Sequence, residues 1–126
     1  MKQMTFKVPF YDIKVMLYQV EGKEDAPKIA NVLRRLKCER EVYDDIISGI
    51  ESGAINGGET FRDFRQKLMV IIFYEWGSEE KKTEIFAHEK RHVEDRIMEF
   101  HGVHDIESAG MLAGWLAVKF RKFENL

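Results

Sequence analysis

The chain is poor in cysteine and proline, has no long apolar run, and has almost no net charge. Its one cysteine, Cys38, has no intramolecular partner, which excludes a disulfide-built scaffold and indicates a reducing compartment. The apolar stretch at residues 109–118 has ten residues, fewer than the roughly 20 that a membrane-spanning helix needs. The first residues lack the apolar segment of a signal peptide. We therefore expect a soluble, cytoplasmic protein without a membrane partner.

The charges of the chain are numerous but balanced. Charged residues make up 33% of the sequence, yet the formal net charge is only −2. No global basic field is therefore available for nucleic acid, and Arg34, Arg35 and Lys37 form only a short basic patch. The 126 residues, 44% of them apolar, suffice for one hydrophobic core. We expect a single domain over residues 1–126.

The apolar residues follow both strand and helix periodicities. Residues 5–20 show partial alternation interrupted by Pro9, which predicts an edge strand or a strand entered through a bend. Residues 68–74 form a continuous apolar run, typical of a strand covered on both faces. Residues 26–50 predict two amphipathic helices or one bent helix. The chain is thus expected to be α+β, with a short mixed or antiparallel sheet.

The most informative motif is H-E-x-x-H at residues 88–92. On a helix, His88 and His92 lie on one face, one turn apart, and can bind the same metal ion. Glu89 is then placed to act on a water molecule at that metal. This residue set is typical of zinc hydrolases, in which two histidines are ligands and the glutamate is the general base.

The surrounding sequence predicts where the motif helix begins and ends. Ser78 can cap its start, Gly102 can end it, and Asp105 can cap a final helix that reaches about residue 120. The motif helix carries an apolar stripe, formed by Phe86, Val93, Ile97 and Phe100. Roughly opposite lies a polar stripe, formed by His88, His92, Asp95 and Glu99. The small residues of the final helix, Gly110 and Gly114 among them, predict a close approach of another backbone.

A catalytic zinc ion normally has three protein ligands, so a third ligand is needed. The candidates downstream of the motif are Asp95, Glu99, His101, His104 and Glu107. Asp95 is better placed to accept a hydrogen bond from an imidazole, and Glu99 lies nearly two turns beyond His92. Glu107, in the first turn of the next helix, is favoured as the third ligand. His101 and His104 stay open as alternatives.

The motif and the helix that follows it resemble a known family. His88-Glu-x-x-His92 followed by Glu107-x-x-Gly110-x-Leu112 looks like the compact gluzincin-type zinc metallopeptidase domains, including small bacterial, phage and mobile-element proteins. The resemblance covers about residues 60–118 and is specific at four positions. It implies a small zincin-like domain, with Zn²⁺ bound by His88, His92 and Glu107 and with Glu89 as the catalytic base.

The sequence therefore predicts a zinc-dependent metallohydrolase, peptidase-like, that acts on a peptide or protein substrate. Lys90 and Arg91 stand where active peptidases have uncharged residues, and they motivate an alternative. That alternative is a catalytically inactive zincin-like binding module of a mobile element. A nucleic-acid-associated accessory protein is a third hypothesis, based only on the short basic patch.

Overall fold

The fold is α+β, built on a four-stranded mixed sheet, as the sequence predicts. We describe it from a computed structural model, which describes residues 1–54, 57–74 and 77–126. The sheet has the order β1-β2-β4-β3, in which β2 and β4 are parallel and the two outer pairs are antiparallel. The strands are β1 (Lys2–Val8), β2 (Ile13–Gln19), β3 (Gly58–Asp63) and β4 (Leu68–Phe73).

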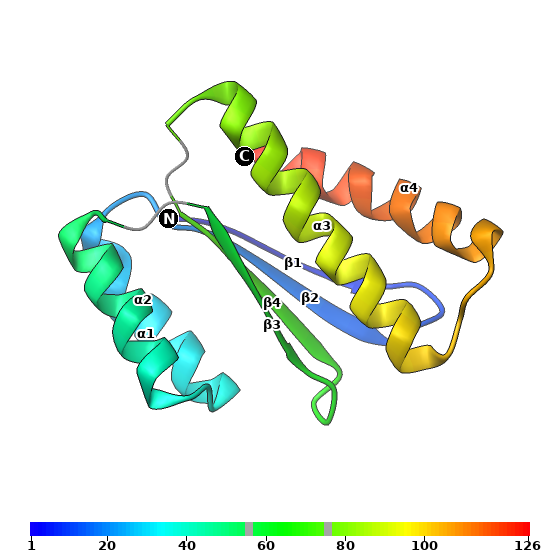
Figure 1. The fold of residues 1–126 in the computed structure, drawn as a ribbon, viewed down its shortest axis with the longest axis horizontal. Helices are drawn as coiled ribbons and strands as arrows, with labels where there is room; N and C mark the ends of the chain where they lie inside the picture. The colour runs from blue at the N-terminus through cyan, green and yellow to red at the C-terminus, as the bar shows by residue number, and fades with distance from the viewer. Residues whose placement is uncertain (55–56, 75–76) are drawn as a thin grey trace.

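The helices cover both faces of this sheet. One face is covered by α1 (Ala26–Leu36), which follows the short 3-10 helix η1 (Lys23–Asp25), and by α2 (Arg40–Ser52). The other face is covered by α3 (Glu79–His101) and α4 (Ile106–Glu124) (Figure 1). No helix of the described residues is long and apolar enough to cross a membrane.

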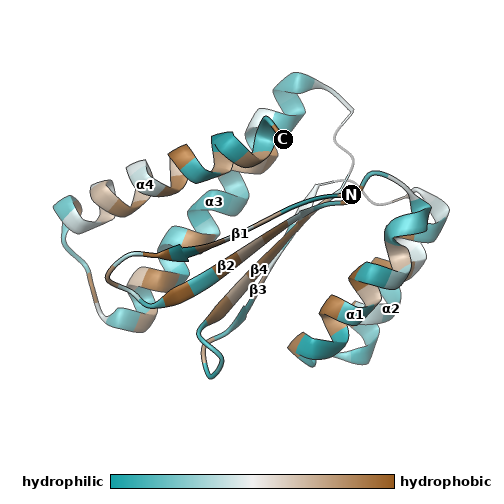
Figure 2. Cartoon of the chain, turned by 180° about the vertical axis from the view of Figure 1, so that it is seen from behind, coloured by the Kyte–Doolittle hydropathy of each residue, from teal (hydrophilic) through white to brown (hydrophobic). Residues whose placement is uncertain are grey.

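Strand β4 contributes to the hydrophobic cores on both faces. Met69, Ile71 and Phe73 belong to the core beneath α3 and α4, whereas Val70 and Ile72 belong to the core beneath α1 and α2. All five side chains are buried. Strand β4 is accordingly coloured as hydrophobic in Figure 2. The predicted strand with two covered faces is confirmed, since alternate side chains of one strand point to opposite faces.

The predicted caps of the last two helices are also confirmed, although α4 extends to Glu124, past the predicted end near residue 120. The Ser78 side chain accepts a hydrogen bond from the Lys81 amide at the start of α3. Gly102 ends α3 with a left-handed φ of 66°, and Asp105 caps α4 by accepting from the Ser108 amide. These caps fix α3 over its whole length, so the H-E-x-x-H motif lies in the interior of a regular helix.

The N-terminal extended region differs from the prediction. The single strand expected within residues 5–20 is wrong, because the segment is a hairpin of β1 and β2 with Pro9 in the connection. Phe10 and Asp12 take the left-handed conformation there, with φ of 70° and 52°. Non-glycine residues seldom adopt this conformation, so the sequence holds no recognisable turn signal.

The close backbone approach predicted at the glycines of α4 is wrong as well. Gly110 and Gly114 are exposed, and a Cβ atom at either position would meet nothing within 4 Å. The buried face of α4 consists of other residues, namely Leu112, Leu116, Phe120 and Phe123. The glycine that does permit a close approach is Gly58 on β3, beside the motif helix.

Candidate metal centre

The two histidines of the motif converge on the surface of α3. The Nε2 atoms of His88 and His92 are 3.0 Å apart, and the two rings are perpendicular. Two nitrogens held by one tetrahedral zinc ion at about 2.0–2.1 Å each lie about 3.3 Å apart. The imidazole pair is therefore close to the spacing that zinc requires. His88 is exposed and His92 is half-buried, so the pair is open to solvent on one side.

Glu89 points inward from the same helix, toward β3. Its side chain is only 4% exposed, and its Oε2 atom accepts a hydrogen bond from the Thr60 hydroxyl. The ligand atoms of His88, Glu89 and His92 all lie within 4.8 Å of one another. The Thr60 hydroxyl thus fixes the carboxylate beside the imidazole pair. A hydroxyl satisfies one acceptor site of the carboxylate but leaves its charge in place.

Gly58 provides the space that the Glu89 side chain occupies. A Cβ atom on Gly58 would lie 2.9 Å from Cγ and 3.2 Å from Cδ of Glu89. Contacts this short require one of the two groups to move. The absence of a side chain at Gly58 therefore lets the carboxylate lie against β3, within reach of Thr60.

The local electrostatics favour a cation. The pKa of Glu59, the β3 residue between Gly58 and Thr60, is raised by burial and, to a smaller extent, by the Glu89 carboxylate. The pKa of Tyr74 is raised by burial first and then by both carboxylates. Within residues 1–54, 57–74 and 77–126, no lysine or arginine lies within 4.0 Å of the Glu89 carboxylate. A metal ion would supply the missing positive charge.

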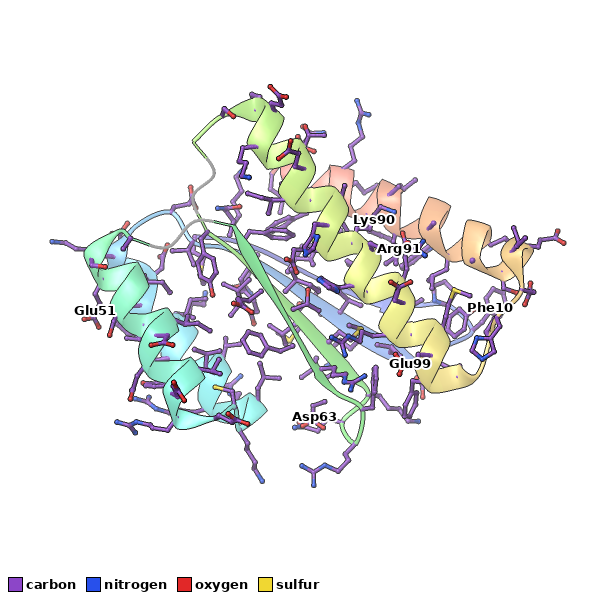
Figure 3. The ribbon with its side chains drawn as sticks, viewed as in Figure 1. Phe10, Glu51, Asp63, Lys90, Arg91 and Glu99 are labelled. Carbon is purple, nitrogen blue, oxygen red and sulfur yellow. The ribbon has the colours of Figure 1, made fainter. Side chains whose placement is uncertain are left out.

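Lys90 and Arg91 serve a different carboxylate. Glu94, also 4% exposed, pairs with Lys90 one turn earlier on α3 and with Arg91 at 3.5 Å. Arg91 additionally pairs with Asp95 at 3.1 Å. Lys90 lines a surface hollow with Ala117 and other α4 residues, on the flank of α3 nearest that helix (Figure 3). The two basic residues inside the motif thus stabilise the buried Glu94, and their ion pairs are with Glu94 and Asp95 rather than with the histidines.

The structure does not bring the predicted third ligand to this group. Glu107 is exposed in the first turn of α4, and among the described residues the cluster of possible ligands consists of His88, Glu89 and His92. The alternatives also lie elsewhere, because His101 packs on Tyr11 and His104 is exposed in the connection to α4. The role of Glu107 as a ligand therefore rests on the sequence alone.

Neither of the other polar candidates joins the imidazole pair. Asp95, predicted to accept from an imidazole, is paired with Arg91 instead. Glu99 is exposed, as expected for a solvated charge (Figure 3). The residues that sequence reasoning missed are Gly58 and Thr60. Their signal is positional, since alternate residues of a strand share a face, but only the packing of α3 on β3 reveals which face matters.

Strand β3 lies at the edge of the sheet and leaves backbone groups free beside the motif. The Tyr74 amide donates to the Gly57 carbonyl at 2.9 Å, which sets the phase of the antiparallel ladder between β3 and β4. By that alternation, Gly58, Thr60 and Arg62 direct their N–H and C=O groups away from β4. Another extended chain could pair with this edge next to the imidazoles.

Comparisons with protein-family models, curated proteins and solved structures find no match to this chain. The resemblance to zinc metallopeptidases noted in the sequence therefore stays a prediction.

Proposed function

We propose that this protein is a zinc-dependent hydrolase that cleaves peptide bonds, with His88 and His92 as metal ligands. One observation carries the proposal. Two imidazole nitrogens 3.0 Å apart lie beside a buried carboxylate, that of Glu89, with no cationic side chain paired to it in the described parts of the chain. Imidazole and carboxylate are the ligand types that zinc prefers in catalytic sites.

Each residue of the site has a definite task in this proposal. Zinc, when bound, lowers the pKa of a coordinated water to about 7 and polarises a carbonyl oxygen. The Glu89 carboxylate takes a proton from the water that attacks the peptide carbonyl carbon. It later gives this proton to the amine that leaves when the peptide C–N bond breaks. Thr60 orients that carboxylate through its hydroxyl hydrogen bond, and Gly58 leaves room for it.

The free edge of β3 supplies a way to hold the substrate. An extended peptide pairs with the outward backbone groups of Gly58, Thr60 and Arg62 and so lies beside the imidazoles. Main-chain pairing accounts for affinity without a deep cleft. This mode suits a flexible segment or terminus of a protein substrate better than a compact folded one.

The proposal is tested with zinc-loaded protein and a complex pool of peptides, with cleavage read by mass spectrometry. Wild-type protein should cleave the pool, and Glu89→Gln should lose at least about a hundredfold in rate, because general-base catalysis contributes 10²–10⁴-fold. Glu99→Gln is the matched control, since Glu99 is an exposed glutamate on the same helix. Equal rates for Glu89→Gln and wild type would contradict the proposal.

The role of Glu107 is tested separately. If it completes the zinc site, Glu107→Gln weakens zinc binding markedly, whereas an exposed glutamate with no such role leaves zinc affinity unchanged. The measurement is zinc content after dialysis against a competing chelator. Retention of stoichiometric zinc by Glu107→Gln would remove Glu107 from the ligand set while leaving His88 and His92 in place.

One observation favours a second candidate, a metal-stabilised binding module without catalysis. Glu89 lies close enough to both imidazoles to serve as a ligand itself. In that case it would not be available as a base. Zinc bound at one equivalent, with no cleavage of any peptide by the wild-type protein, would decide for the binding module.

A further inference from the structure

Two arginines, the exposed Arg62 on β3 and the half-buried Arg96 on α3, lie farther from Gly58 than Thr60 and Glu89 do, along the surface where α3 packs on β3. We propose that Arg62 and Arg96 together bind a carboxylate, so that the peptides held at the β3 edge are acidic ones. The identification of these peptides as substrates rests on the proposed function. Recognition of an acidic peptide by the two guanidinium groups does not itself require hydrolase activity.

Two contacts between α3 and the β3 region bracket the position of the arginine pair. The Thr60 hydroxyl bonds to Glu89, and four residues farther along the chain the Phe64 ring packs on Phe100 with centroids 4.3 Å apart. Arg62 lies midway and on the same strand face as Thr60, with its guanidinium 5.7 Å from the Phe64 ring centroid.

On α3, Arg96 lies between Glu89 and Phe100, just as Arg62 lies between Thr60 and Phe64. It lies seven residues after Glu89 and four before Phe100, and these spacings put all three residues on one helix face. Because Glu89 and Phe100 both contact residues of β3 or its end, Arg96 faces β3 as well. Both arginines therefore lie between the Thr60–Glu89 contact and the Phe64–Phe100 contact, one on β3 and the other on α3.

Neither arginine has an acidic partner among the residues that the structure describes. Nearby basic residues do, since Arg91 pairs with Asp95 and Arg65 with Asp63. Arg96 is nevertheless half-buried, so its charge is partly desolvated without an ion pair. A carboxylate that reaches both guanidinium groups would accept charge-assisted hydrogen bonds from both and supply the acidic partner that each lacks.

The strand direction places the acidic residue relative to the cleaved bond. A peptide antiparallel to β3 runs from the level of Phe64 toward that of Gly58, and so passes the arginines before it reaches Glu89. Thr60 and Arg62 are two residues apart, a separation of about 7 Å along a strand. For a peptide that pairs antiparallel to β3, the preferred acid lies on the N-terminal side of the cleaved bond, about two residues away.

The test is a binding measurement with a labelled alanine- and threonine-rich peptide that carries a single aspartate, and with its asparagine counterpart. Fluorescence anisotropy is recorded in excess chelator, so neither zinc nor turnover is needed. Wild-type protein should bind the aspartate peptide about tenfold more tightly, as expected for charge-assisted hydrogen bonds. Arg62→Gln and Arg96→Gln should each remove most of this preference.

Arg35→Gln is the matched control, because Arg35 is an exposed arginine on α1, on the opposite face of the sheet, and its loss changes the net charge equally. Equal binding of the two peptides, no binding of either, or an unchanged preference in an Arg62→Gln/Arg96→Gln double variant would overturn the inference. A preference for aspartate without any hydrolysis would support carboxylate binding by the two arginines and refute the proposed hydrolase activity. Hydrolysis without the preference would do the reverse.

Discussion

Two buried glutamates on α3 have opposite electrostatic surroundings. Glu89 and Glu94 are each 4% exposed and lie five residues apart on one helix. Glu94 is neutralised by Lys90 and Arg91 on the flank nearest α4. Glu89, facing β3, has a hydroxyl partner and two imidazole neighbours. No lysine or arginine in the described part of the chain forms an ion pair with it.

The comparison separates a structural carboxylate from one suited to chemistry. Burying a charge is costly unless it is paired, so a fold that needs only stability neutralises the group, as it does at Glu94. Glu89 is oriented by the Thr60 hydroxyl and has no lysine or arginine paired to it among the described residues. A mobile cation held by His88 and His92 would complete the site. The basic residues of the motif are thus compatible with metal binding, because they act on the other flank.

The largest effect on stability is expected when the ion pair between Lys90 and Glu94 is broken. Lys90→Met leaves Glu94 with only Arg91, and should lower the free energy of unfolding by about 2–3 kcal/mol, less than for a fully buried pair because Lys90 retains some exposure. Chemical denaturation measures this change. Lys81→Met, which removes an exposed lysine from an i,i+3 pair on the same helix, should cost less than about 1 kcal/mol. Equal losses for the two variants would contradict the structural role of Lys90.

Filling the space beside Glu89 should have the next largest effect. Gly58→Ala forces the carboxylate away from β3 and should cost about 1–2 kcal/mol in stability, within the range of about 1–3 kcal/mol that is typical of overpacking. Zinc affinity should fall as well. Gly110→Ala is the control, because its Cβ meets open space in a helix interior, and it should stabilise the protein by about 0.5–1 kcal/mol. Thermal unfolding of both variants gives the signs, and a stabilising Gly58→Ala would be evidence against the packing of α3 on β3.

Neutralising each glutamate in turn should change stability in opposite directions. In metal-free protein, Glu89→Gln removes an uncompensated buried charge and should raise the unfolding free energy by about 1 kcal/mol. Glu94→Gln removes the partner of Lys90 and should lower it. The two variants are compared by denaturation in excess chelator. A loss of stability in both would show that Glu89, like Glu94, is a structural residue.

Asp12, a carboxylate on the surface, differs from both buried glutamates and is expected to give the smallest effect on stability. Hydrogen bonds from Lys67 and Lys7 lower the pKa of Asp12 to about 2. Because the folded pKa is depressed, the stabilisation is complete above the ordinary pKa of 3.8 and disappears as the pH falls toward 2. An NMR titration should therefore give a midpoint near 2 in wild type, shifted upward in Lys67→Met. A midpoint near 3.8 in the wild-type protein would rule out these ion pairs.

What the sequence could predict depends on how local each signal is. The caps at Ser78, Gly102 and Asp105 are local, and so is the i,i+4 spacing that brings His88 and His92 together once the segment is helical. The hydrogen bond from Thr60 to Glu89 joins residues 29 apart in the chain and depends on how α3 crosses β3. No sequence pattern encodes that crossing.

The same limit applies to the third ligand and to the first hairpin. Glu107 follows the motif by a short connection, but whether its side chain reaches the imidazoles depends on the packing of α4, which exposes it. The hairpin between β1 and β2 turns on Phe10 and Asp12, residues that seldom take left-handed conformations. Both features arise from tertiary packing that overrides the local preferences.

The most direct test is a calorimetric titration of the metal-free protein with zinc. Wild type should bind one zinc ion per chain, and Glu94→Gln should bind it with similar affinity because Glu94 lies on the other flank of α3. The His88→Ala/His92→Ala double variant should bind none. Absence of zinc binding by the wild type, or binding that persists unchanged in the double variant, would contradict the assignment of this site as a metal centre.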